Sequence, residues 1–240
     1  MAGETVKTKA IVIDIRPWSR TSHITTWLTP ERGPVATLVK GAVRPKSRFL
    51  GQYDLFYTCE LVYYVRAKGE LHAIREASPI DMREYIRGDY RATALASYAA
   101  YLVGEHCPHG GGDADRWFRF LERRLDHLAE SPADATSIVG LECEFLALAG
   151  LSPDFSGADF SASSIPFAID LGHVGEGGRT VRISGATARA LAGGDGDAGA
   201  GDIASAVRFL GMFMRYHLEL PPEIRRNTLT LIPDFSGCAP

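Results

Sequence analysis

The side chains best suited to binding chemistry are four cations close together near the start of the chain. They fall within nine residues, with glycines nearby and a proline inside the run: Lys40, Gly41, Arg44, Pro45, Lys46, Arg48 and Gly51. Lys and Arg neutralise phosphate groups without needing a substrate of fixed shape, so a loop of this kind can hold a nucleic-acid backbone. A solvated hairpin loop would have the same composition, and the segment alone leaves both interpretations open.

The charge of the chain is unevenly distributed. Its 240 residues carry a formal net charge of −3, but residues 1–80 hold 12 Lys and Arg against 7 Asp and Glu. Residues 81–240 hold 14 against 22, and all five lysines lie in the first 68 residues. Residues 1–80 are therefore basic and residues 81–240 acidic. This asymmetry favours a polyanionic partner for residues 1–80.

Motifs for catalysis and for cofactors are not found. The stretch from Gly41 to Ser47 ends in Lys-Ser like a phosphate-binding loop, but Pro45 stands where a glycine N–H is needed. No nucleophile elbow and no zinc-protease motif occurs. We expect a binding protein that is not an enzyme and that has no cofactor.

The cysteines and the hydropathy pattern indicate the compartment. No two of Cys59, Cys107, Cys143 and Cys238 lie close in sequence, so neither a zinc ribbon nor a redox dithiol is expected. No run of about 18 apolar residues could span a membrane, and Met1–Thr5 does not resemble a signal peptide. We expect a cytoplasmic protein with free thiols and no bound metal.

The pattern of elements predicts an α+β protein with two domains. Short β-branched and aromatic runs over 6–16, 22–29, 34–40, 54–66 and 71–76 predict five strands that close into a small barrel over residues 1–80. Helical periodicity over 82–107, 114–129, 134–149, 184–192 and 202–218 predicts a helical domain over 81–240. An irregular insertion at about 151–183 contains a possible strand pair at 166–171 and 179–183.

A series of short segments resembles the bacterial recombination-mediator family RecO. They include Arg16–Ser19, Thr29–Gly33, Val39–Ala42, Lys46–Arg48, Lys68–Leu71 and Phe145–Asp154. The resemblance is dense over residues 6–77 and thinner over 81–155. It implies an N-terminal OB-fold, a helical domain and usually a small zinc ribbon. It also implies binding to single- and double-stranded DNA, strand annealing, and loading of RecA with the partner RecR onto strands coated by single-strand-binding protein (SSB), whose acidic tail is bound.

The chain departs from that pattern at two places that matter for sites. Where many relatives have Cys-x-x-Cys, this chain has Phe155–Asp159, so the insertion is expected to be a degenerate, metal-free ribbon. Arginines that help to hold the SSB tail are replaced by Val139 and Gly140. We expect arginines of the second helix to take over this contact, although a solvated cationic face explains them as well: Arg116, Arg119, Arg123 and Arg124.

The expected DNA site is the basic loop with its neighbours. It comprises Lys40, Arg44, Lys46 and Arg48, extended by Lys7, Lys9 and Arg20. Trp18 and Phe49 are candidates for base stacking. The alternative is a protein-interaction adaptor whose OB-fold contacts only protein partners. The preference between single and double strands, and the oligomeric state, stay open at this point.

Overall fold

The computed structural model describes residues 4–66, 69–131, 133–193 and 198–232. The chain divides into two compact units, Met1–Ser131 and Pro132–Pro240. The first unit contains β1 (Thr5–Ser19), β2 (Ser22–Thr29), β3 (Gly33–Val39), β4 (Thr58–Tyr64), β5 (Leu71–Asp81), α1 (Glu84–Gly88), α2 (Tyr90–His106) and α3 (Ala114–His127). The second contains α4 (Ala135–Leu148), β6 (Ile165–Ala168), β7 (His173–Val174), β8 (Thr180–Ile183), α5 (Gly185–Leu191), α6 (Ala200–His217) and α7 (Pro222–Thr230).

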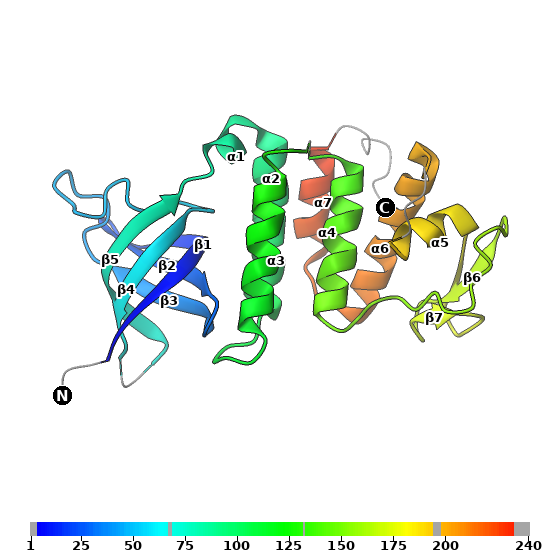
Figure 1. The fold of residues 1–240 in the computed structure, drawn as a ribbon, viewed down its shortest axis with the longest axis horizontal. Helices are drawn as coiled ribbons and strands as arrows, with labels where there is room; N and C mark the ends of the chain where they lie inside the picture. Colours follow the sequence, from blue (N-terminus) through cyan, green and yellow to red (C-terminus); the bar gives the residue numbers. More distant parts are fainter. Residues whose placement is uncertain (1–3, 67–68, 132, 194–197, 233–240) are drawn as a thin grey trace. The chain divides into compact units, whose positions relative to one another are not determined.

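The five strands of the first unit form a closed barrel in the order β1-β2-β3-β5-β4, with β4 returning to β1 (Figure 1). This confirms the OB-fold prediction. The long β1 pairs with two strands: its first half, up to Ile11, pairs with β4, and from Ile11 onward it pairs with β2, with an irregularity between Val12 and Asp14. The pairing of β3 with β5 is parallel and aligns Leu38 with Ala73. That parallel pair closes the barrel and places two distant segments side by side.

The barrel interior is filled by alternate residues of each strand. Thr8, Ala10 and Val12 of β1 are buried in alternation along the strand. Trp27 is fully buried and donates from Nε1 to Oγ1 of Thr37 at 2.8 Å. This hydrogen bond offsets the free-energy cost of burying the indole N–H.

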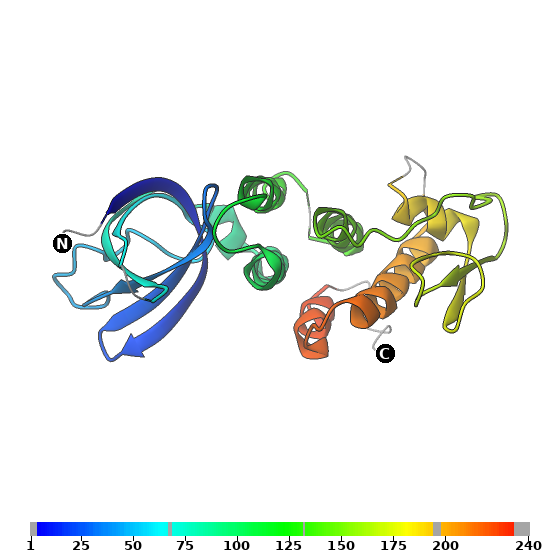
Figure 2. The ribbon, with the colours of Figure 1, turned by 90° about the horizontal axis from the view of Figure 1, so that it is seen from below.

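The opposite face of β1 is covered by helices of the same unit. Ile11 and Ile13 are buried although they alternate with the interior residues, because α2 and α3 form an antiparallel pair beside the barrel (Figures 1 and 2). Gly104 of α2 approaches Ile13, whose Cδ1 would lie 3.6 Å from a Cβ at position 104. The barrel and these helices therefore share apolar contacts.

Among the predicted boundaries that differ from those observed, two have a clear local cause. The single helix expected over 82–107 is divided at Asp89, whose carboxylate accepts a hydrogen bond from the N–H of Arg91 and begins α2. Tyr85 and Tyr90, on either side of this division, are exposed. The fourth strand begins at Thr58 and not at Asp54, because Phe56 adopts a positive φ of 68° within a turn.

In the second unit, the insertion at about 151–183 contains a small sheet of order β7-β6-β8. The predicted strand pair corresponds to β6 and β8, while β7 and α7 were not expected. The sheet is attached to α6 by aromatic rings in tilted and edge-to-face contact. The ring centroid of Phe167 lies 5.1 Å from that of Phe155 and 4.9 Å from that of Phe209.

A buried ion pair joins the helices of the second unit. Glu142 of α4 is fully buried and accepts hydrogen bonds from Nε and Nη2 of Arg225 in α7, at 2.7 and 2.9 Å. The same Nη2 donates to the carbonyl of Val207 in α6 at 2.8 Å. One guanidinium thus connects three helices.

Candidate nucleic-acid interface

One end of the barrel carries a groove with a volume of about 590 Å³. It is built from β3, the loop that follows β3, the start of the turn after β4, and β5. The lining residues are Leu38, Lys40, Gly41, Arg44, Lys46, Ser47, Arg48, Phe49, Arg66, Ala73 and Ile74. The four cations predicted from the sequence therefore surround one concavity.

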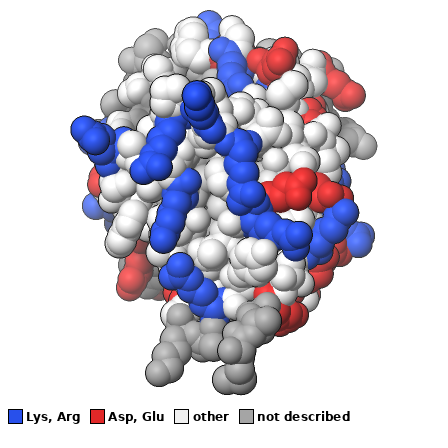
Figure 3. Space-filling view, turned by 90° about the vertical axis from the view of Figure 1, so that its left-hand side faces the viewer, with Lys and Arg blue, Asp and Glu red and all other residues white. Residues whose placement is uncertain are grey.

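The charge of this groove is wholly positive. Five of its lining residues are Lys or Arg, and none is acidic. Within the ranges that the structure describes, none of these five side chains forms an ion pair with a carboxylate. Figure 3 shows Lys and Arg side chains spread over this end of the barrel. Unpaired cations around a hollow attract a polyanion, since no internal partner has to be displaced.

The basic loop, residues 40–51, is held by successive turns. Gly41 has a φ of +67°, which favours glycine, and its carbonyl accepts a hydrogen bond from the N–H of Arg44 at 3.2 Å. Further turns follow at Ser47 and Leu50. The loop is tied to the β1–β2 turn because the N–H of Val43 donates to the carbonyl of Thr21 at 3.4 Å. The cations are therefore displayed by an ordered backbone.

The floor of the groove is apolar. Leu38 and Ala73 lie opposite each other on β3 and β5, and both are half-buried. Phe49 and Ile74 are each only 8% exposed. The guanidinium carbon of Arg48 lies over the Phe49 ring, 4.8 Å from its centroid. The groove thus combines a cationic rim with a hydrophobic floor.

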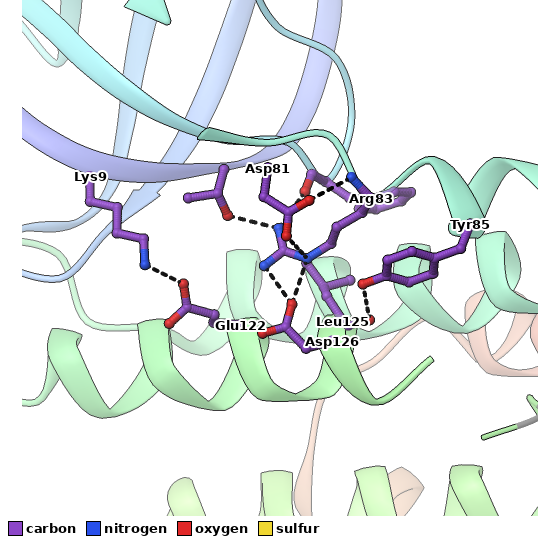
Figure 4. A network of polar contacts seen from close by, with 9 residues as sticks. Lys9, Asp81, Arg83, Tyr85, Glu122, Leu125 and Asp126 are labelled. Carbon is purple, nitrogen blue, oxygen red and sulfur yellow. Dashed lines mark hydrogen bonds and ion pairs between the residues drawn. The ribbon is translucent and has the colours of Figure 1, made fainter. Parts of the chain in front are cut away.

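Other predicted DNA-binding residues lie away from this groove. Lys7 pairs with Glu60 at 2.9 Å. Lys9 pairs with Glu122 of α3 at 2.6 Å (Figure 4). The Lys9 ammonium also lies over the ring of Phe118. These pairs reduce the positive charge that the two lysines can offer to phosphates.

Arg20 is closer to the basic loop, because it precedes Thr21 in the turn to which that loop is bonded. Of the stacking candidates, Trp18 is 60% exposed near the same turn, whereas Phe49 belongs largely to the core. Val43 and Leu50 of the basic loop are also exposed.

Arg66 is a groove residue that the sequence analysis missed. It follows β4 and reaches the groove only because β5 returns parallel to β3. The signal available in the sequence was its place close to Lys68, which lies outside the described residues. Ala73 and Ile74 were missed for the same reason.

The candidate partner surface on α3 is less open than expected. Arg116 pairs with Asp113 at 3.4 Å, and Arg119 with Asp115 at 2.6 Å. Phe118 and Leu121 are buried under the helix, so neither forms an exposed apolar groove beside Arg123 and Arg124. Binding of a partner at these four arginines stays a prediction.

A polar network fixes the end of the barrel to α3 (Figure 4). The buried Arg83 follows β5 in a left-handed conformation, with a φ of 42°. Its guanidinium donates to the carbonyl of Phe56, to Oγ1 of Thr58 and to Asp126. Tyr85 adds a hydrogen bond to the carbonyl of Leu125 at 3.0 Å.

The described part of the chain shows neither a metal-binding cluster nor a membrane-spanning helix. No group of three or more His, Cys, Asp or Glu side chains there is arranged to hold a metal ion. No helix among those residues has the length and apolar character needed to cross a bilayer. The predicted absence of a bound metal stays a prediction.

Comparison with known proteins gives consistent matches. The family model "Recombination protein O N terminal" matches residues 1–83, and "Recombination protein O C terminal" matches residues 87–226. The chain is 30% identical over 152 residues to the DNA repair protein RecO of Anaeromyxobacter sp. (strain K), covering 62% of this chain and 58% of that one. It is 31% identical over 147 residues to that of Geobacter metallireducens, covering 61% and 59%. The matched region thus spans about six tenths of these relatives. With both family models matched in order, the chain belongs to the recombination protein O (RecO) family.

Proposed function

We propose that this protein binds DNA through the cationic groove of its barrel and acts in DNA repair and recombination. Its relatives carry the name DNA repair protein. The observation that carries the proposal is a set of five cations around one concavity, none of which forms an ion pair with a carboxylate among the described residues: Lys40, Arg44, Lys46, Arg48 and Arg66. The groove lies on a five-stranded barrel of a kind that binds oligonucleotides through its strands and loops.

Binding of this kind depends mainly on phosphates. Each cation that neutralises a phosphate releases condensed counterions, so affinity falls as salt rises. Contacts to the backbone carry no sequence information. We therefore propose binding that is largely independent of base sequence, with Arg20 as an additional contact beside the basic loop.

The proposal extends to strand annealing and to the loading of RecA. A surface that screens the charge of two strands together lowers their repulsion, and annealing then needs no catalytic group. We propose that the protein works at the nucleoid with RecR on strands coated by SSB. These partners follow from family membership, and their contacts are to be tested separately.

The test is a titration of labelled single-stranded DNA at several salt concentrations. Replacing Lys40, Arg44, Lys46 and Arg48 with Ala should weaken binding and lower the log–log salt slope by about 0.7 for each lost contact, or about 3 in all. A matched control removes four exposed arginines of the second unit: Arg179, Arg182, Arg189 and Arg226.

Binding that is unchanged by the first set of substitutions would place the DNA site elsewhere. If the parent protein does not bind DNA at all, the barrel serves a protein partner. The exposed apolar residues Trp18, Val43 and Leu50 near the groove would then be the first candidates for that contact.

A further inference from the structure

We infer that Ser47 is a phosphorylation site and that a phosphate on this residue blocks DNA binding in the cationic groove. The inference rests on the proposed DNA-binding function and adds a means of regulating the same site. Three observations support it: the position of Ser47 in the groove, the cations that flank it in sequence, and the state of its hydroxyl group.

Ser47 is the residue with a hydroxyl group among those that line the groove. It lies in the basic loop, where its N–H donates a hydrogen bond to the carbonyl of Arg44 at 2.8 Å. The residue is half-buried, so part of it is in contact with solvent. A group attached to the hydroxyl oxygen is therefore added to the lining of the groove, next to its cations.

The sequence around Ser47 matches the substrates of arginine-directed protein kinases. Such kinases recognise positive charge at fixed positions beside the acceptor serine, above all three residues before it. Arg44 lies three residues before Ser47, Lys46 directly before it, and Arg48 directly after it. The loop belongs to no helix or strand, so a kinase can bind it in an extended form without disrupting a regular element.

Two other serines also have an arginine three residues before them, and the structure distinguishes both from Ser47. Ser19 is the last residue of β1 and does not line the groove. Ser78 lies within β5 and is paired with Glu60 of β4, so a kinase would have to open the barrel to reach it. Among these three serines, the kinase pattern coincides with the groove only at Ser47.

The hydroxyl group of Ser47 is available for phosphoryl transfer. Its oxygen accepts a hydrogen bond from the N–H of Phe49 at 3.2 Å, and its proton is donated to no acceptor among the described residues. In the transfer, a bond forms between Oγ and the γ-phosphorus of ATP while the bond from that phosphorus to the oxygen of ADP breaks. The hydroxyl proton passes to the catalytic base of the kinase.

A phosphate on Ser47 changes the charge of the groove. Phosphoserine carries a charge of about −1.5 to −2 near neutral pH and has three strong acceptor oxygens. The lining contains no acidic residue, so the phosphate is the first negative charge among its five cations. Arg44 and Arg48, the nearest arginines in the loop, are the expected donors of charge-assisted hydrogen bonds to it.

The phosphate competes directly with DNA. An arginine that binds an internal phosphate no longer neutralises a phosphate of the nucleic acid, and the added negative charge repels the backbone. Loss of about two contacts lowers the log–log salt slope on single strands by about 1.4. At roughly 0.1 M salt the same loss weakens affinity by about 10-fold to 50-fold.

The experiment treats the full chain with an arginine-directed serine kinase and ATP, beside a portion treated without ATP. Mass spectrometry of proteolytic fragments locates the phosphate, and anisotropy of a labelled single strand measures DNA affinity at several salt concentrations. We expect phosphate on Ser47, weaker binding with a lower salt slope, and recovery of both after treatment with a phosphatase.

The variant Ser47→Asn tests whether Ser47 is responsible. Asn offers a side-chain oxygen to the N–H of Phe49 but cannot be phosphorylated in this way, so the turn is preserved. Treatment with the kinase should leave its DNA affinity unchanged. This comparison excludes effects of phosphates added elsewhere on the chain.

A second pair of variants tests the charge without a kinase. Ser47→Glu adds one negative charge to the groove and should lower the salt slope by about 0.7. The matched control is Ser97→Glu, which adds the same charge at an exposed position of α2 in the same unit. We expect this control to leave the slope unchanged.

The outcomes separate the two proposals. Phosphate on Ser47 with unchanged DNA affinity and salt slope overturns the inference and leaves the proposed function intact. A kinase that modifies other residues and leaves Ser47 unmodified overturns it as well. If the unmodified protein does not bind DNA, the proposed function is overturned, and the inference with it.

Discussion

Arg83 donates from Nε to Oδ1 of Asp126 at 2.9 Å and thereby joins the last residues of the barrel region to α3. The side chain of Arg83 is only 2% exposed, whereas that of Asp126 is 54% exposed. The buried guanidinium of Arg83 is therefore neutralised by a carboxylate that is itself exposed to solvent. The helices that follow the barrel are held to it by this contact and by the apolar contacts of β1.

Replacement of Arg83 with Met should destabilise the protein by about 2–3 kcal/mol. The carbonyl of Phe56 and the hydroxyl of Thr58 would lose their donor, and a buried group without its hydrogen bond costs about 1–3 kcal/mol. Urea unfolding followed by circular dichroism measures the change. Arg119→Ala is the control, because its exposed pair with Asp115 is worth little and stability should stay within about 0.5 kcal/mol. Equal effects of the two changes would contradict the assigned role of Arg83.

Gly211→Ala should destabilise the second unit although Ala is the better helix former. A Cβ at position 211 would lie 2.7 Å from Nη1 of Arg225, whose guanidinium is held by the buried Glu142. The matched control is Gly201→Ala in the same helix, where no atom lies within 4 Å, and we expect a gain of at most about 1 kcal/mol. Thermal unfolding of both variants measures these changes. A higher unfolding temperature for Gly211→Ala would show that the ion pair of Arg225 with Glu142 can shift to admit the new methyl group.

Stability should fall at alkaline pH in a way that depends on Cys59. Burial raises the pKa of the Cys59 thiol from about 9.0 to about 12. Above about pH 9 the unfolded chain loses this proton while the folded chain keeps it, so the free energy of unfolding falls by up to about 1.4 kcal/mol per pH unit until about pH 12. Urea unfolding at about pH 8 and about pH 10 tests this.

The Cys59→Ala variant is the control for that series. It should show a shallower loss between the two pH values than the parent, because the thiol that titrates has been removed. Cys107, whose pKa burial also raises to about 12, continues to contribute in both proteins. Identical pH dependence of parent and variant would exclude Cys59 as a source of the effect.

Chelators should leave the sheet of β6, β7 and β8 folded. Its attachment depends on Phe167 between Phe155 and Phe209, and aromatic packing does not require a metal. We expect elemental analysis to find no stoichiometric zinc and EDTA to leave the unfolding temperature unchanged. Phe167→Ala, in contrast, should cost about 3–5 kcal/mol. One zinc per chain, released with loss of structure, would contradict this prediction.

A peptide with the acidic, apolar-ended character of the SSB tail should bind less tightly when Arg123 and Arg124 are both replaced with Ala. Calorimetry measures the affinity. The double change Arg116→Ala with Arg119→Ala is the matched control, because it removes the same number of charges from the same helix. If the first variant binds as tightly as the parent, the site lies elsewhere. If the parent does not bind, the contact was lost with the arginines replaced by Val139 and Gly140.

The sequence by itself determined the local structure and the central part of the candidate site. Period-two alternation in β1 and helical periodicity in α3 and α4 are properties of neighbouring residues, so they could be read from the chain. Lys40, Arg44, Lys46 and Arg48 lie within nine residues, so one loop was bound to bring them together. The division of the first helix at Asp89 was missed because a single capping side chain decided it.

Only the tertiary structure decided which other residues share the groove. Arg66 and Ala73 line the groove because β3 and β5 pair in parallel. Lys9, in contrast, forms an ion pair with Glu122 of α3. Such pairings join residues far apart in sequence, and they form where the whole barrel and its helices bury the most apolar surface. Neighbouring residues contain no information about that choice, because the free energy that selects it comes from the packed core as a whole.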